Sequence, residues 1–140
     1  MISVVDSCVA VKWYAPEPDR AVARKLLGHP LIAPDQIRAE VASALWKKVS
    51  AGEVEPAQAL RALAHLGGII KFMPSEPLAD MALGLALDLG HPVYGCFFLA
   101  LAQTLNFPLI TSDRKLWLRT RRTAFNGRVI MLEDWRPDDD

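Results

Sequence analysis

The chain contains 140 residues, of which 51% are hydrophobic, and this length suits one compact domain over 1–140 with a sizeable core. Lys and Arg together number 16, as do Asp and Glu, so the formal net charge is zero. This balance excludes a basic field over the whole molecule, and any contact with RNA or DNA therefore requires a local basic patch.

The sequence also disfavours membrane proteins, disulfide or zinc scaffolds, and nucleotide-binding proteins. No apolar stretch reaches the roughly 20 residues that span a bilayer, and the first residues carry no basic leader, so we expect a cytoplasmic protein without a membrane partner. Cys8 and Cys96 form no CxxC pair and have no His at ligand spacing, which predicts reduced, buried thiols. Neither a GxGxxG nor a GxxxxGK[ST] motif occurs, so we expect no small-molecule nucleotide cofactor.

The first half of the chain alternates short apolar runs with segments of helical period. Residues 2–5 predict a strand that leads into a short helix over 7–13, and a second helix is expected over 19–27. Residues 31–33 predict the next strand. The long helix that follows, over 35–52, has apolar residues at every fourth position, which is typical of a helix with one buried face.

The same alternation continues in the second half. A helix over 56–66 is expected to end at a turn formed by Gly67 and Gly68, and residues 69–73 predict a strand. Two further helices are expected over 76–89 and 93–105.

The last expected strands are 108–111 and 129–131, and the acidic residues 138–140 are interpreted as a solvated tail. Short apolar strands that alternate with helices predict an α/β fold with a parallel sheet of about five strands and helices on both faces.

Ligands of a parallel sheet collect at the carboxyl ends of its strands. Asp6 ends the first apolar run and Asp113 follows the fourth, while Glu40 lies at the rim of the buried face of the long helix. Taken singly, Asp6 and Asp113 could be helix caps, and Glu40 a solvated helix residue. Together, three clustered carboxylates would repel one another without a cation, and oxygen ligands favour Mg²⁺ or Mn²⁺.

The histidines and the basic segment 114–128 are two further groups of polar residues. His29, His65 and His91 are expected in loops or on helix surfaces, since none has a nucleophile or acid at suggestive spacing. Residues 114–128 contain bases and no acid, which favours either a solvated helix end or a phosphate-binding patch beside the metal site. The bases proposed for that patch are Arg114, Lys115, Arg119, Arg121 and Arg122.

Four ordered segments resemble the motifs of PIN-domain proteins, and the match is closest to the VapC-type ribonuclease toxins of type II toxin–antitoxin pairs. They are Val4-Val5-Asp6-Ser7-Cys8, Glu40-Val41-Ala42-Ser43-Ala44-Leu45, Val93-Tyr94-Gly95-Cys96 and Leu109-Ile110-Thr111-Ser112-Asp113. The resemblance covers nearly the whole chain, and four motifs in order are far more specific than any one of them.

The resemblance implies a PIN-like fold and an endoribonuclease that depends on Mg²⁺ or Mn²⁺. It also implies a homodimer that acts on RNA and is held inactive by a VapB-type antitoxin. On the family pattern, Asp6, Glu40 and Asp113 would be catalytic metal ligands, and Ser7, Thr111 and Ser112 would support them.

Two positions depart from the family pattern. Cys8 stands where the family usually has Ser or Asn, and Gly95 stands where the third motif has an acidic residue. Because the stripe over 93–105 has no turn that requires glycine, we expect Gly95 to impair the site. A substitution that disarms the toxin, a degenerate natural copy, or a site remodelled around Glu40 and water would explain it, and we favour the first.

Two other functions stay open. A non-catalytic PIN-fold module could bind the antitoxin or an operator complex, and a metal-dependent phosphatase or DNA nuclease could use the same acids. RNA cleavage by this chain and by a Gly95→Asp variant separates the leading hypothesis from the first of these.

Overall fold

The structure is a computed structural model that describes residues 1–137, and in this part of the chain five parallel strands form one sheet of order β3-β2-β1-β4-β5. The strands are β1 (Ser3–Val5), β2 (Leu31–Pro34), β3 (Ile70–Met73), β4 (Leu109–Thr111) and β5 (Val129–Met131). The predicted α/β class and parallel sheet are confirmed. The acidic tail predicted for 138–140 lies outside the described residues.

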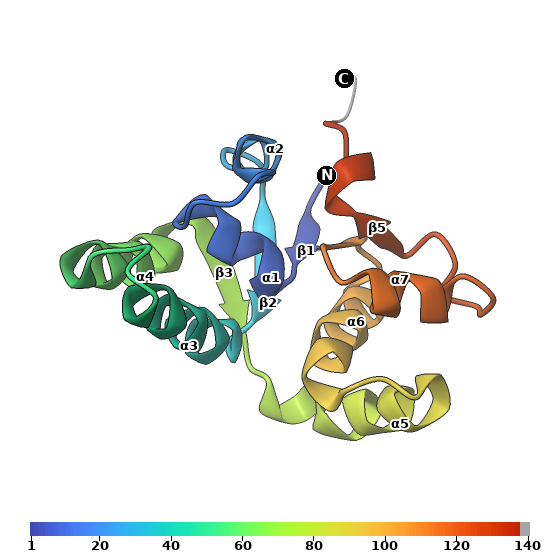
Figure 1. Ribbon diagram of the computed structural model, residues 1–140. Coiled ribbons are helices and arrows are strands. Elements are labelled where there is room, and N and C mark those ends of the chain that lie inside the picture. The colour runs from blue at the N-terminus through green and yellow to red at the C-terminus, as the bar shows by residue number, and fades with distance from the viewer. Residues whose placement is uncertain (138–140) are drawn as a thin grey trace.

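Helices flank this sheet (Figure 1). The α-helices are α1 (Ser7–Ala10), α2 (Arg20–Arg24), α3 (Ile37–Ser50), α4 (Pro56–Ile69), α5 (Ala79–Leu89), α6 (Val93–Leu105) and α7 (Arg114–Thr120). Short 3-10 helices are η1 (Val11–Trp13), η2 (Glu76–Leu78) and η3 (Leu132–Asp134). Figure 1 shows α3 and α4 as a pair on one side and α5 and α6 as a pair on the other.

The strand register explains why distant acids meet. Val4 of β1 pairs with Ile32 of β2 on one side and with Leu109 of β4 on the other, so β1 lies at the centre of the sheet. The backbone N–H of Asp6 donates to the carbonyl of Ile110 at 3.0 Å. The residues that follow β1 and β4 therefore leave the sheet at the same edge.

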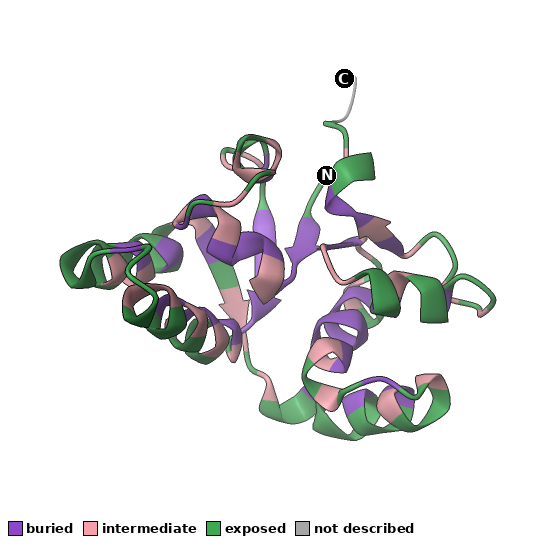
Figure 2. Ribbon diagram, viewed as in Figure 1, coloured by how far each residue is buried: buried purple, intermediate pink, exposed green. Residues whose placement is uncertain are grey.

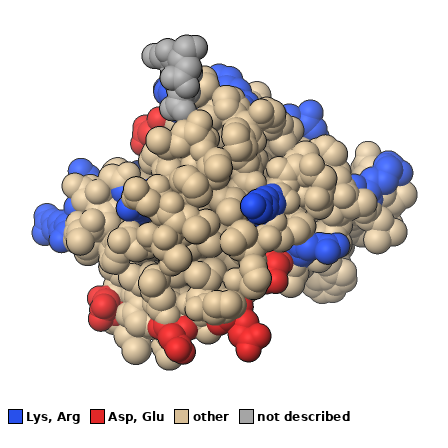
Figure 3. Space-filling model, turned by 180° about the vertical axis from the view of Figure 1, so that it is seen from behind, with Lys and Arg blue, Asp and Glu red and all other residues tan. Residues whose placement is uncertain are grey.

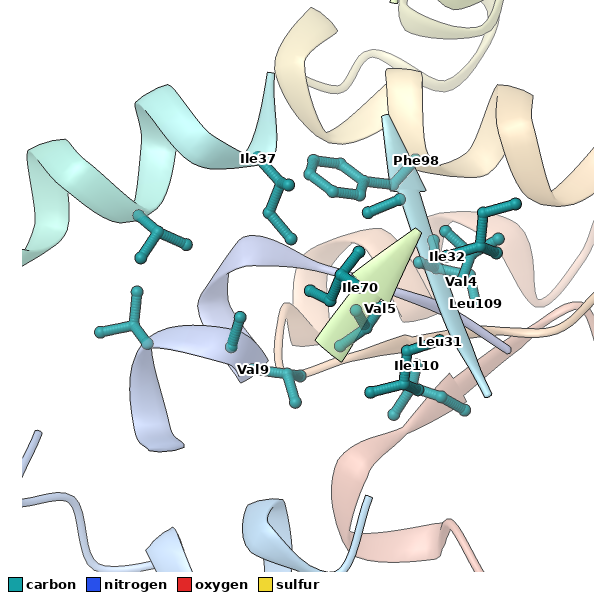
Figure 4. Packing of buried hydrophobic residues seen from close by; sticks show 14 of the residues in the cluster. Val4, Val5, Val9, Leu31, Ile32, Ile37, Ile70, Phe98, Leu109 and Ile110 are labelled. Carbon is teal, nitrogen blue, oxygen red and sulfur yellow. The ribbon is translucent and has the colours of Figure 1, made fainter. Parts of the chain in front are cut away.

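The hydrophobic core is built on the strands and on α6. Strands β1, β2 and β4 and much of α6 are buried, whereas β3 at the sheet edge is partly exposed and α3, α4 and α5 turn exposed faces outward (Figure 2). Phe98 of α6 is fully buried, and α6 packs against β1 and β2. Figure 4 shows Phe98 with apolar side chains of the strands and of α3. This core fixes the strand ends from which the polar residues project.

Some predicted boundaries are wrong. The helix expected to end at Gly67 runs through both glycines to Ile69, because neither glycine has a positive φ and the chain passes directly into β3. The helix expected over 19–27 is only Arg20–Arg24, and the end of the helix expected over 7–13 is the 3-10 turn η1. The start of the helix expected over 76–89 is likewise a 3-10 turn, η2.

No single helix within residues 1–137 is long and apolar enough to cross a membrane. The segments Glu76–Leu89 and Val93–Leu105 reach that length only as a pair bent by 114°. Within the same residues, Cys8 and Cys96 are free thiols, as expected; Cys96 is buried and Cys8 half-buried.

Candidate active site

Asp6 lies at the carboxyl end of β1 and is only 6% exposed. Its Oδ2 accepts a hydrogen bond from the hydroxyl of Thr111 at 2.8 Å, and its Oδ1 lies 3.5 Å from the hydroxyl of Ser7. It occupies the N-cap position of α1, but its side chain makes no cap hydrogen bond. Burial raises the pKa of Asp6 to about 6, and the nearby charge of Asp113 acts in the same direction.

Glu40, in the first turns of α3, reaches the same edge. The hydroxyl of Ser7 donates to Glu40 Oε1 at 3.3 Å, and the side-chain amide of Gln36 donates to Oε2 at 3.1 Å. Burial raises the pKa of Glu40 to about 7, and the charge of Asp6 raises it further. Ser7 therefore lies between two carboxylates whose negative charges repel each other.

Asp113 performs the capping role that we considered for it. Its Oδ1 accepts from the backbone N–H groups of Lys115 at 3.1 Å and Leu116 at 3.3 Å, which caps α7. Its own N–H donates to the hydroxyl of Thr111 at 3.0 Å. Because the same hydroxyl donates to Asp6, Thr111 connects the first acid to the last.

The residues around Thr111 complete this network. The backbone N–H of Ser112 donates to the sulfur of Cys8 at 3.4 Å, and that sulfur lies 3.6 Å from the Thr111 hydroxyl. The Ser112 hydroxyl is buried without a hydrogen-bond partner among residues 1–137. A buried polar atom without a partner is unusual, so the site has room for a further hydrogen-bonding group.

The surface location expected for His91 is wrong. His91 is 7% exposed, and its Nε2 lies 3.1 Å from Asp113 Oδ2 while its Nδ1 lies 2.7 Å from an Arg119 nitrogen. It was missed because it stands two residues before α6 and belongs to no periodic stripe. Because His91 lies outside α6, helix spacing in the sequence gives no signal that relates it to Gly95.

The backbone at Gly95 does not require glycine, as expected, because its φ is not positive, but the side chain of His91 lies close to it. A Cβ atom at this position would lie 3.1 Å from His91 Nε2 and 3.3 Å from His91 Cδ2, which is closer than ordinary van der Waals contact. Gly95 therefore makes room for the imidazole ring of His91.

The basic residues of 114–122 differ in their contacts, since some have a partner within the protein and others are exposed. Arg114 pairs with Glu133 at 2.6 Å, and Arg121 lies over the ring of Trp117 at 4.6 Å. Arg119 is engaged by His91. Lys115 and Arg122 are exposed. Seen from behind, the molecule carries scattered Lys and Arg side chains and a row of acidic side chains along its lower edge (Figure 3).

The donor set suits a hard divalent cation held partly by water. All three acids offer oxygen ligands, and two of them have raised pKa values because no positive charge compensates their burial. Within residues 1–137, however, no three Asp, Glu, His or Cys side chains converge as a metal site. These residues fit an ion bound by one or two carboxylates and several waters, which is the coordination that Mg²⁺ usually adopts in proteins.

The fold and the site together define a parallel α/β domain with acidic residues at the carboxyl edge of its sheet. The PIN-domain family model matches residues 3–122, and the chain belongs to the PIN-domain family. It is 32% identical over 121 residues to Ribonuclease VapC3 of Pyrobaculum aerophilum, covering 81% of this chain and 90% of that protein. It is 32% identical over 82 residues to Exonuclease VapC9 of the same organism, covering 59% of this chain and 61% of that protein.

Solved structures agree with this fold. A Pyrobaculum aerophilum protein known from its crystal structure superposes with a TM-score of 0.74 at 24% identity, covering 95% of this chain and 90% of that chain. A toxin–antitoxin complex from Klebsiella pneumoniae gives a TM-score of 0.67 at 15% identity, covering 93% of this chain and 97% of that chain. The expected PIN-like fold and the likeness to VapC proteins are thereby confirmed.

Proposed function

We propose that this protein is a VapC-type toxin that cleaves RNA internally and depends on Mg²⁺ or Mn²⁺. The observation that carries the proposal is the linked set of Asp6, Glu40 and Asp113 at one sheet edge, in a chain 32% identical to a protein named ribonuclease. A second relative is named exonuclease, so the position of the cuts within the RNA is part of what must be measured.

Each residue at this edge has a physical task in the proposal. Asp6, Glu40 and Asp113 would be the ligands of the ion, and Thr111 orients Asp6 by donating to its Oδ2. Ser7 lies between the carboxylates of Asp6 and Glu40, and its single hydroxyl proton can be donated to either one. When bound, the ion would lower the pKa of a water molecule and stabilise negative charge on the phosphate. Exposed Lys115 and Arg122 would contact phosphates of the RNA.

We infer that the site is impaired because Gly95 supplies no carboxylate. The test is cleavage of structured RNA by the parent and by Gly95→Asp, with Mg²⁺, with Mn²⁺ and with EDTA. We expect weak or no cleavage by the parent and cleavage by Gly95→Asp that EDTA abolishes. Gly95→Asn, which has nearly the same shape without the charge, is the matched control and should remain inactive.

The outcomes separate the competing functions. Equal activity of the parent and Gly95→Asp would remove Gly95 from the site. Inactivity of both, with intact antitoxin binding, would favour the non-catalytic module. Cleavage of DNA or of phosphomonoesters in place of RNA would favour the other phosphoryl-transfer enzymes.

The proposed partners are a VapB-type antitoxin and a second copy of the chain, and an apolar groove between α3 and α4 is a surface on which to test both. The groove has a volume of about 320 Å³, and Trp46 at its edge is 68% exposed. An exposed tryptophan beside an apolar groove is typical of an interaction surface. Trp46→Glu should weaken binding of the product of a small upstream reading frame or shift the oligomeric state, measured by analytical ultracentrifugation.

A further inference from the structure

The imidazole of His91 links two charged residues of the α7 region. His91 follows α5 and precedes α6, and its side chain is almost completely buried. One ring nitrogen lies 3.1 Å from a carboxylate oxygen of Asp113, and the other lies 2.7 Å from a guanidinium nitrogen of Arg119. Both nitrogens of the ring are therefore engaged.

The chemistry of the two partners fixes the proton on this ring. A guanidinium group only donates hydrogen bonds, so His91 Nδ1 accepts from Arg119 and carries no proton. The proton of the neutral ring is then on Nε2, from which it is donated to Asp113.

The ring occupies the space in which a side chain at position 95 would begin. A Cβ atom there would be 3.1 Å from the same Nε2 that donates to Asp113. A larger residue at 95 and the present position of His91 therefore exclude each other unless the ring moves by a few tenths of an ångström. Glycine at 95 therefore leaves the present contact between His91 and Asp113 undisturbed.

We propose that His91 is a positioning residue for Asp113. Its ring occupies the space beside Asp113 that a side chain at position 95 would otherwise enter, and it substitutes there for the side chain that Gly95 lacks. The inference rests on the proposed function to the extent that Asp113 acts in the nuclease site. The α7 backbone binds Oδ1 of Asp113 and His91 binds Oδ2, so the carboxylate has one orientation. A neutral donor orients this carboxylate but adds no negative charge for an ion.

These contacts also give Arg119 a role other than phosphate binding. A guanidinium that donates to His91 stands behind the site as the second member of a chain from Arg119 through His91 to Asp113. Arg119 is therefore part of the support of Asp113 rather than a free member of the phosphate-binding patch.

The first test needs neither metal nor RNA. In the ¹⁵N-labelled full chain without metal at pH 8, the His91 ring signals are assigned by their loss in His91→Gln. We expect an unprotonated Nδ1 and a protonated Nε2, and a change in these signals in Arg119→Leu. A proton on Nδ1, or His91 signals unaffected by Arg119→Leu, would overturn the proposed chain.

The second test is a double-mutant cycle read by calorimetric titration with Mn²⁺. Loss of a group that orients a metal ligand typically reduces metal affinity about 10- to 100-fold, and we expect this for His91→Ala in the parent. His91→Gln, which retains an amide donor and a carbonyl acceptor, should keep most of the affinity. In the Gly95→Asp background, His91→Ala should have a smaller effect, because the added side chain shifts the ring from its present contact with Asp113.

The cycle separates the two proposals. An equal effect of His91→Ala in both backgrounds, or none in either, would refute the substitution of His91 for the missing side chain. Circular dichroism of each variant, with His91→Gln as the conservative comparison, reports whether a lost affinity reflects unfolding. If no variant binds Mn²⁺, the metal-dependent function fails, while the ring-nitrogen signals still decide whether His91 orients Asp113.

Discussion

Asp6→Asn should stabilise the metal-free protein at alkaline pH, because burial of the Asp6 carboxylate opposes its ionisation. The pKa of Asp6 rises from an ordinary 3.8 to about 6 in the folded chain. At 1.36 kcal/mol for each pH unit, this difference corresponds to about 3 kcal/mol of lost stability once the group is ionised. The loss is absent below pH 3.8 and is complete above pH 6, so the stability of the parent falls across that interval.

The assay is urea unfolding in EDTA at pH values between 4 and 8, with the free energy of unfolding compared between Asp6→Asn and the parent. Other groups that titrate here, including His91, are present in both proteins and cancel to first order in the difference. We expect the difference to grow by about 3 kcal/mol from pH 4 to pH 8, equivalent to roughly 6–12 °C in Tm. Removing a like charge near Glu40 acts in the same direction.

Added Mg²⁺ should reverse the order of the two proteins. The ion stabilises a folded chain that binds it and leaves the unfolded chain unaffected, so the parent gains stability and Asp6→Asn gains less. A free-energy difference that stays flat from pH 4 to pH 8 in EDTA would show that Asp6 is not held in a desolvated environment. The proposed role of its burial would then be wrong.

Three further outcomes follow from particular contacts. Phe98→Ala should cost about 3–5 kcal/mol in urea unfolding, because Phe98 is fully buried, whereas Leu87→Ala at an exposed position should cost little. Asp113→Ala should cost about 1 kcal/mol through the lost cap of α7, and Asp113→Asn, which retains an oxygen acceptor, should cost less in the same measurement. The double change Lys115→Ala and Arg122→Ala should weaken filter binding to single-stranded RNA and reduce the salt slope by about 1.4.

The strands were predictable because each is a short apolar run bounded by a turn or a charged residue. Asp6 and Asp113 were predictable as neighbours for a related reason, since both follow buried parallel strands. The helix end predicted at Gly67 and Gly68 was wrong. Glycine commonly ends helices, whereas here α4 continues through both glycines directly into β3.

The support of the acids could not be predicted from the sequence. Contacts of Thr111 with Asp6 and of Ser7 with Glu40 depend on how segments 33 or more residues apart are docked. His91 is the clearest case, because its partners lie 22 and 28 residues away in a separate helix region. Spacing along the chain indicates which residues share a helix face, but it does not show what packs against that face.

Capping and function are not alternatives for Asp113. The cap uses Oδ1, and the second oxygen, Oδ2, lies 3.1 Å from His91 Nε2. A residue fixed by a helix terminus is well suited to hold charge at a defined position, because its backbone partners do not move when a ligand arrives.

We expect the glycine at 95 to lower the metal affinity of the site and to raise the stability of the protein without metal. A Cβ atom at 95 and Asp113 Oδ2 each lie 3.1 Å from His91 Nε2, so no more than about 6 Å separates them. A carboxylate at 95 would repel Asp113 by on the order of 1–3 kcal/mol at an effective dielectric of about 20, reduced by solvent at the partly exposed Asp113. Because both variants carry the same Cβ, Gly95→Asp should have a lower Tm in EDTA than Gly95→Asn and a larger rise in Tm when Mg²⁺ is added. If Gly95→Asp were as stable as Gly95→Asn in EDTA, the new carboxylate would lie away from Asp113, and the assignment of position 95 to this site would be wrong.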